Sequence, residues 1–221
     1  MSKRTTLTLQ AMKEQGEKIT MITAYDYSSA MLSEKAGIDT ILVGDSLQMV
    51  MLGDDSTIAA TLDTMIHHTK AVVKGAPETF VVTDLPFGSY NVSIEQAIET
   101  SSRCMKEGRC DAVKLEGGVR MKNVIKAVVD AGIPVVGHIG LTPQTTAQLG
   151  GFKVQGKGDA ARKVLEDALA VQEAGACMIV LEAIPAPLAT LITERLSIPT
   201  IVRSLFIMIC LECLTSSFLS L

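Results

Sequence analysis

Short apolar runs alternate with longer segments of helical period along most of this 221-residue chain. The runs predict strands that are buried on both faces, and the longer segments predict helices. We expect strands at Ile19–Asp26, Thr40–Asp45, Phe80–Pro86, Ala112–Gly118, Val135–Leu141, Met178–Ile184 and Pro199–Arg203. We expect helices at Tyr27–Ala36, Thr61–Lys74, Ile94–Glu107, Lys122–Ala131, Asp159–Ala174 and Pro187–Leu196. Repeated units of this kind build a parallel sheet, either open and doubly wound or closed into a (β/α)₈ barrel.

Polar residues at the ends of the predicted strands favour the barrel. They close or nearly close successive apolar runs: Asp26, Asp45, Asp84, Glu116, His138 and Glu182. A barrel brings all of its strand ends to one mouth, whereas an open sheet gathers only those near its switch point. We therefore predict an α/β fold of the (β/α)₈ TIM-barrel type.

Glycines follow several of the predicted helices and suggest how those helices end. They are Gly37, Gly75, Gly108, Gly132 and Gly175. Helices commonly end on a residue in the left-handed conformation, which glycine adopts without strain. We expect a left-handed C-cap at each of these positions.

Composition narrows the class of protein. With 48% hydrophobic residues the chain can bury a sizeable core as one domain, and its net charge of −4 argues against nucleic-acid binding. The N-terminus lacks an apolar leader, so we expect a cytoplasmic protein without a membrane partner. Five cysteines without a paired framework indicate reduced thiols.

Asp45 and Asp84 each follow a mainly apolar run. A buried carboxylate is unfavourable unless it is paired, hydrogen-bonded or bound to metal, and two on neighbouring strands repel each other. A divalent cation removes the repulsion, and an all-oxygen ligand set suits Mg²⁺ better than Zn²⁺. The alternative is that both residues are helix N-caps.

The segment VKLEGG (113–118) adds Lys114 and Glu116 on one face of a strand, since residues two apart share a face. Glu116 would complete the metal shell directly or through water, and Lys114 would bind the carboxylate of a substrate. The alternative is a buried ion pair between the two.

Glu182 and His138 are candidates for proton transfer and substrate binding. Partial burial would raise the pKa of Glu182 and suit it to moving a proton. The alternatives are a salt bridge at the rim for Glu182 and a satisfied core imidazole for His138. The long polar segment at 141–161 is a candidate lid.

Eight ordered motifs resemble those of the ketopantoate hydroxymethyltransferase family, from about Thr5 to Ile201. They are TAYDYSSA (23–30), LVGDSLQMVMLG (42–53), HHTKAV (67–72), VVTDLPFGSY (81–90), VKLEGG (113–118), GHIGLTPQ (137–144), GGFKVQGKG (150–158) and VLEAIP (180–185). The resemblance implies transfer of a hydroxymethyl group from 5,10-methylenetetrahydrofolate to 3-methyl-2-oxobutanoate, giving 2-dehydropantoate in pantothenate biosynthesis. It also implies a homo-oligomer, commonly a decamer.

The resemblance implies roles for individual residues. Mg²⁺ would be held by Asp45 and Asp84, with Glu116 at or near the metal, and Glu182 would be the catalytic base. We assign substrate binding to Asp45, Ser46, Asp84, Lys114 and His138. A relative of the phosphoenolpyruvate mutase and isocitrate lyase group is the alternative enzyme.

The sequence departs from the family pattern after Ile201. The family continues with a glycine-rich strand end and an eighth βα unit, whereas this chain reads VRSLFIMICLECLTSSFLSL. Compared with the family pattern, we expect a barrel domain at 1–201 that is incomplete after its seventh strand. We expect a divergent, aggregation-prone tail at 202–221 that arises from a frameshift, a retained intron or a truncated gene model. An inactive fragment, or a subunit that only associates with full-length copies, is therefore a further alternative.

Overall fold

Seven parallel strands form the centre of the structure, a computed structural model that describes residues 3–203. The strands pair in sequence order: β1 (Met21–Thr23), β2 (Thr40–Val43), β3 (Phe80–Asp84), β4 (Ala112–Glu116), β5 (Val135–Gly140), β6 (Met178–Glu182) and β7 (Thr200–Arg203). The α-helices are α1 (Thr6–Gln15), α2 (Tyr27–Lys35), α3 (Leu47–Val50), α4 (Leu62–Gly75), α5 (Ile94–Arg103), α6 (Lys122–Asp130), α7 (Thr146–Leu149), α8 (Ala160–Glu173) and α9 (Ala186–Arg195).

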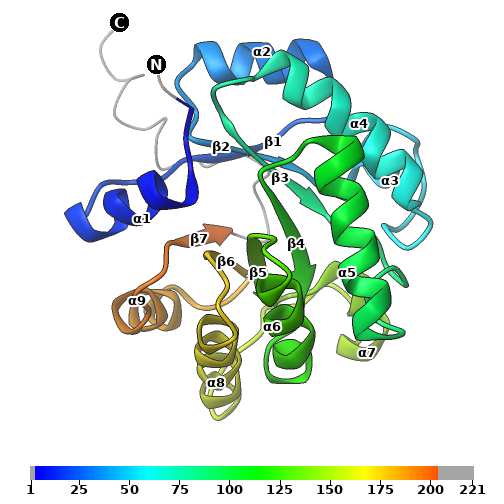
Figure 1. Ribbon diagram of the computed structural model, residues 1–221. Coiled ribbons are helices and arrows are strands. Elements are labelled where there is room, and N and C mark those ends of the chain that lie inside the picture. The colour runs from blue at the N-terminus through cyan, green and yellow to red at the C-terminus, as the bar shows by residue number, and fades with distance from the viewer. Residues whose placement is uncertain (1–2, 204–221) are drawn as a thin grey trace, which may run out of the picture.

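The helices that follow the strands cover the outside of the sheet, which curls around a central axis (Figure 1). Across residues 3–203, each strand is hydrogen-bonded to its sequence neighbours, and β1 and β7 are the two edges. Over these residues the predicted (β/α)₈-type architecture is confirmed as far as its seventh strand. Val202 and Arg203 extend β7, and the predicted tail beyond them, with Cys210 and Cys213, lies outside the described residues.

Two apolar layers hold this arrangement together. Alternate strand residues point outward and pack against the helices in the larger core. The others fill the barrel, where Leu42, Val82 and Val136 belong to a second cluster that also contains Leu9 and Met12 of α1. Helix α1 therefore closes the interior of the barrel with two apolar side chains.

Helix α1 was not among the predicted elements. A capping box defines its start, with the Thr5 side chain accepting a hydrogen bond from the Thr8 amide, and Gly16 ends it in the left-handed conformation. Strand β1 is shorter than predicted because Asp26 leaves the strand and caps α2, where its side chain accepts from the Ser29 amide.

The predicted left-handed glycines are correct at Gly37, Gly132 and Gly175, and wrong at Gly75 and Gly108. Those two glycines serve close packing instead. A Cβ at Gly75 would lie 2.4 Å from the carbonyl oxygen of Tyr27, and one at Gly108 would lie 3.1 Å from Cγ2 of Thr69. After the π-helical turn Cys104–Gly108, the left-handed residue is Arg109, with φ of 63°.

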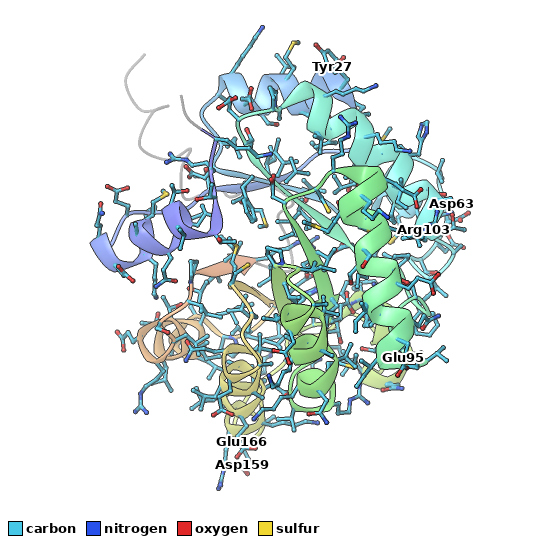
Figure 2. All side chains as sticks on the ribbon, viewed as in Figure 1. Tyr27, Asp63, Glu95, Arg103, Asp159 and Glu166 are labelled. Carbon is cyan, nitrogen blue, oxygen red and sulfur yellow. The ribbon has the colours of Figure 1, made fainter. Side chains whose placement is uncertain are left out.

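Charged side chains lie on the outer faces of the helices. Figure 2 shows Asp63 of α4 and Arg103 of α5 next to each other there, and Arg103 Nη2 donates to Asp63 Oδ1 at 2.8 Å. Of the helices seen between residues 3 and 203, none is long and apolar enough to cross a membrane.

Candidate active site

Six buried polar residues at the carboxyl ends of the strands make up what we call the strand-end cluster: Asp45, Asp84, Lys114, Glu116, His138 and Glu182. Their exposed fractions lie between 2% and 6%. Strand register brings them together, because it pairs Asp84 with Lys114 and Glu116 with His138. The structure thus gathers all of the predicted catalytic and metal-binding residues, and places Ser46 directly after Asp45.

Asp45 and Asp84 are neighbours across β2 and β3. The backbone N–H of Asp45 donates to Oδ2 of Asp84 at 3.1 Å. Gly44 permits this approach, since a Cβ there would lie 2.9 Å from Ser46 Oγ and 3.5 Å from Asp84 Oδ2. Neither aspartate caps a helix: Ser46 precedes α3, and Asp84 ends β3. The N-cap interpretation is therefore wrong for both.

The two aspartates share a buried environment that disfavours negative charge. Burial, followed by the charge of Asp84, raises the pKa of Asp45 to about 7, against the opposing effect of Lys114. Burial also raises the pKa of Asp84, although Lys114 again opposes the change. A cation other than Lys114 would stabilise the ionised forms of both carboxylates.

Lys114 pairs with Asp84 rather than with Glu116. Its Nζ lies 2.7 Å from Asp84 Oδ1 and 3.2 Å from Nδ1 of His138. Burial alone lowers the pKa of Lys114, but the charges of Asp84, Glu116 and Asp45 outweigh this effect and raise it. The predicted alternative of a Lys114–Glu116 pair is wrong, and Lys114 is a charged ammonium among three carboxylates.

His138 lies between two glutamates. Its Nδ1 is 3.4 Å from Glu116 Oε1, and its Nε2 is 3.1 Å from Glu182 Oε2. Burial and the charge of Lys114 lower the pKa of His138, but the contacts with Glu116 and Glu182 outweigh both and raise it. The imidazole is buried and in contact with carboxylates on each side, which favours its charged form.

Glu182 differs from the sequence-based expectation in its pKa. Burial raises this pKa, as expected, but the contact with His138 and the charges of His138, Arg203 and Lys114 bring it below the ordinary value. Arg203 Nη1 donates to Glu182 Oε2 at 3.0 Å, because the register pairs the two residues across β6 and β7. The prediction of a raised pKa is therefore wrong, and Glu182 is ionised at neutral pH. The contact between Glu182 and Arg203 is a salt bridge, as the alternative interpretation of Glu182 predicted.

The aspartate pair fits a divalent cation better than the full predicted triad does. Oδ1 of Asp84 is buried without a directed hydrogen bond in residues 3–203, although it is close to Lys114. In the same part of the chain, no three His, Cys, Asp or Glu side chains gather as a metal site. Glu116 is turned toward His138 and toward the backbone N–H of Gln144, which donates to its Oε2 at 3.1 Å. Assignment of Glu116 to the metal stays a prediction.

The sequence did not indicate four residues that touch the site: Tyr25, Tyr90, Gln144 and Arg203. The Tyr25 hydroxyl lies 2.9 Å from Ser46 Oγ, and Tyr90 and Gln144 hydrogen-bond to each other. The first three belong to the motifs TAYDYSSA, VVTDLPFGSY and GHIGLTPQ, which was the signal available. Arg203 lies beyond the last of the eight motifs, so no motif indicated it.

Solved structures with a similar fold come from a group that includes phosphoenolpyruvate mutase. A phosphoenolpyruvate phosphomutase from Streptomyces platensis subsp. rosaceus aligns with a TM-score of 0.69 at 17% identity, covering 90% of this chain and 72% of that one. A phosphonopyruvate hydrolase, solved in complex with oxalate and Mg²⁺, aligns with a TM-score of 0.67 at 15% identity, covering 91% and 72%. At these identities the likeness shows the barrel fold alone.

Sequence relatives are much more similar. The 3-methyl-2-oxobutanoate hydroxymethyltransferase of Heliobacterium modesticaldum is 62% identical over 91% of this chain and 74% of its own length. The enzyme of the same name from Moorella thermoacetica is 57% identical over 87% and 72%. The family profile of ketopantoate hydroxymethyltransferase matches residues 3–203. The chain therefore belongs to the ketopantoate hydroxymethyltransferase family of enzymes.

Proposed function

We propose that this chain transfers a hydroxymethyl group from 5,10-methylenetetrahydrofolate to 3-methyl-2-oxobutanoate, giving 2-dehydropantoate, with Mg²⁺ as cofactor. The observation that carries the proposal is the strand-end cluster, in a chain 62% identical to the 3-methyl-2-oxobutanoate hydroxymethyltransferase of Heliobacterium modesticaldum. The reaction requires removal of a proton from C3 and stabilisation of the resulting anion. The cluster combines a carboxylate that can accept the proton with groups that can bind an anionic substrate.

Asp45 and Asp84 would hold the metal, with Glu116 at or near it. Mg²⁺, when bound, supplies positive charge that stabilises the anion left at the oxo acid after proton loss. Lys114 carries an ammonium beside Asp84 and would bind the substrate carboxylate, and Ser46 would contact the same oxo acid.

Glu182 would remove the C3 proton. Its ionised form at neutral pH is the form that a general base requires. His138 contacts Glu116 and Glu182 through its two ring nitrogens, so it can stabilise the ionised form of Glu182 before the transfer. Donation from Nε2 to the substrate would replace its contact with Glu182. The anion formed at C3 then attacks the one-carbon unit of the folate. Both C–N bonds that hold this carbon break, water supplies the hydroxyl oxygen, and tetrahydrofolate leaves with the proton taken from C3 and one proton of the water on its two nitrogens.

The test uses the full chain with Mg²⁺, 3-methyl-2-oxobutanoate and 5,10-methylenetetrahydrofolate. We expect 2-dehydropantoate by mass spectrometry and, without folate, exchange of the C3 hydrogen with deuterated water by proton NMR. Exchange without product would contradict the transferase proposal but keep the base. Absence of both product and exchange would favour the alternative of an inactive or association-only subunit. We also propose a homo-oligomeric assembly in the cytoplasm.

The Arg203→Ala substitution should change the pH dependence of the exchange reaction. Arg203 helps to hold the pKa of Glu182 below its ordinary value, so its loss should raise that pKa. Because the base acts in its ionised form, the acid limb of the exchange rate against pH should move to higher pH. The matched control is Arg195→Ala, at an exposed position near the end of α9. An unmoved acid limb in the Arg203 variant would show that this ion pair does not set the pKa of the base.

A further inference from the structure

The side chain of Gln144 has every hydrogen-bonding group engaged inside the candidate site. Its Nε2 donates to Asp45 Oδ2 and to the carbonyl oxygen of Leu85, each at 2.9 Å. Its Oε1 accepts from the Tyr90 hydroxyl at 2.5 Å. The opposite amide orientation would set Oε1 against two acceptors, so these contacts determine which way the amide faces. Gln144 is only 5% exposed, so water does not compete for them.

Gln144 also holds a second carboxylate through its backbone. Its N–H donates to Glu116 Oε2 at 3.1 Å. One residue therefore contacts Asp45, which follows β2, and Glu116, which ends β4. It belongs to the 3₁₀ turn Pro143–Thr145, which begins the segment between β5 and α8.

Tyr90 fixes Gln144 in turn. The Tyr90 hydroxyl accepts a hydrogen bond from the Glu116 backbone N–H at 3.3 Å, so its own hydrogen is directed to Gln144. Tyr90 is 1% exposed and cannot turn to solvent. Gln144, Tyr90 and Glu116 thus form a closed set of hydrogen bonds with Asp45 attached to it.

We propose that Gln144 is a positioning residue for the reaction: its side chain holds the Asp45 carboxylate in the orientation in which it takes up the cation, and its backbone N–H keeps Glu116 turned toward His138 beside it. The inference rests on the proposed function, because that function places Asp45 at the cation and Glu116 at or near it. Gln144 acts through these carboxylates and does not itself contact a reacting atom. Residues that orient metal ligands in this way typically change metal affinity by about 10- to 100-fold when they are replaced.

The test replaces Gln144 with methionine, which keeps the length of the side chain and removes both amide groups while leaving the backbone N–H in place. Isothermal titration of the full chain with Mg²⁺, in the presence of 3-methyl-2-oxobutanoate, measures the affinity for Mg²⁺. We expect Gln144→Met to weaken Mg²⁺ binding by about 10-fold or more. Tyr90→Phe, which removes only the hydroxyl behind Gln144, should weaken it by a smaller factor.

Gln148→Met is the matched control. Gln148 lies on the same segment and is exposed, and within residues 3–203 its side chain hydrogen-bonds only to Arg120, at 3.4 Å. If Gln144 has only a structural role, Gln144→Met would lower the unfolding temperature and leave Mg²⁺ affinity within twofold of wild type. That result would overturn this inference and leave the proposed function intact. If wild-type protein shows no Mg²⁺-dependent binding, the proposed function and this inference both fail. Should Gln144→Met not fold, unchanged Mg²⁺ affinity in Tyr90→Phe would overturn the inference.

Discussion

The Glu182→Gln substitution is expected to reduce exchange of the C3 hydrogen of 3-methyl-2-oxobutanoate by about 10²- to 10⁴-fold, the usual contribution of a general base. Glutamine has the size of glutamate and can still contact His138 and Arg203, but it cannot accept the proton. Because Glu182 is not a proposed metal ligand, binding of the oxo acid with Mg²⁺ should persist. Proton NMR in deuterated water measures the exchange, and isothermal titration measures the binding.

Two further variants separate loss of the base from disturbance of the site. Glu194→Gln removes an exposed carboxylate of α9 and should leave exchange unchanged. Glu182→Asp keeps the charge but shortens its reach, so it should retain more exchange than Glu182→Gln. Wild-type exchange in Glu182→Gln would remove this residue from the base role.

The positions of the strand-end cluster were predictable from the sequence because the barrel imposes a simple rule. Each βα unit directs the carboxyl end of its strand to the same mouth, so a polar residue that ends an apolar run must face that mouth or its rim. Asp45, Asp84 and Glu182 satisfy this rule, and the structure buries all three together.

The pairing within the cluster was not predictable, because it depends on strand register. A shift of one residue moves every side chain of a strand to the opposite face. Because β3 and β4 are buried on both faces, their apolar pattern does not distinguish one register from the next. The register places Lys114 beside Asp84, whereas the sequence offered Glu116 as its partner only in the alternative interpretation. The same limit applies to Arg203, which the register places opposite Glu182. Its charge adds to the larger effect of His138 in bringing the pKa of Glu182 below the ordinary value.

Gln144 shows a second limit. It follows a proline in a polar segment, where periodicity carries no information about burial. Its partners Asp45 and Tyr90 lie 99 and 54 residues away in the sequence, so only the folded chain brings them together. Helix α1 was missed for a related reason, since its two buried side chains, Leu9 and Met12, leave most of the helix surface polar.

The Asp84→Ala substitution is expected to abolish Mg²⁺-dependent binding of 3-methyl-2-oxobutanoate. It removes one of the two adjacent carboxylates proposed to hold the cation, and it leaves the buried ammonium of Lys114 without its 2.7 Å partner. Breaking a buried ion pair in this way typically costs about 3 to 5 kcal/mol of stability. Isothermal titration measures the binding, and chemical denaturation measures the free energy of unfolding.

A double variant distinguishes lost ligation from lost stability. Asp84→Asn combined with Lys114→Met removes both charges of the pair together, so no unpaired ammonium remains in the interior. The double variant should recover much of the stability lost in Asp84→Ala. Mg²⁺ binding should stay absent in Asp84→Ala and in the double variant, because neither alanine nor the uncharged amide of asparagine replaces the charge of the carboxylate. Asp130→Asn, which breaks an exposed pair with Lys126, is the control and should change neither measurement. Recovery of Mg²⁺ binding in the double variant would show that Asp84 supports the fold rather than the metal.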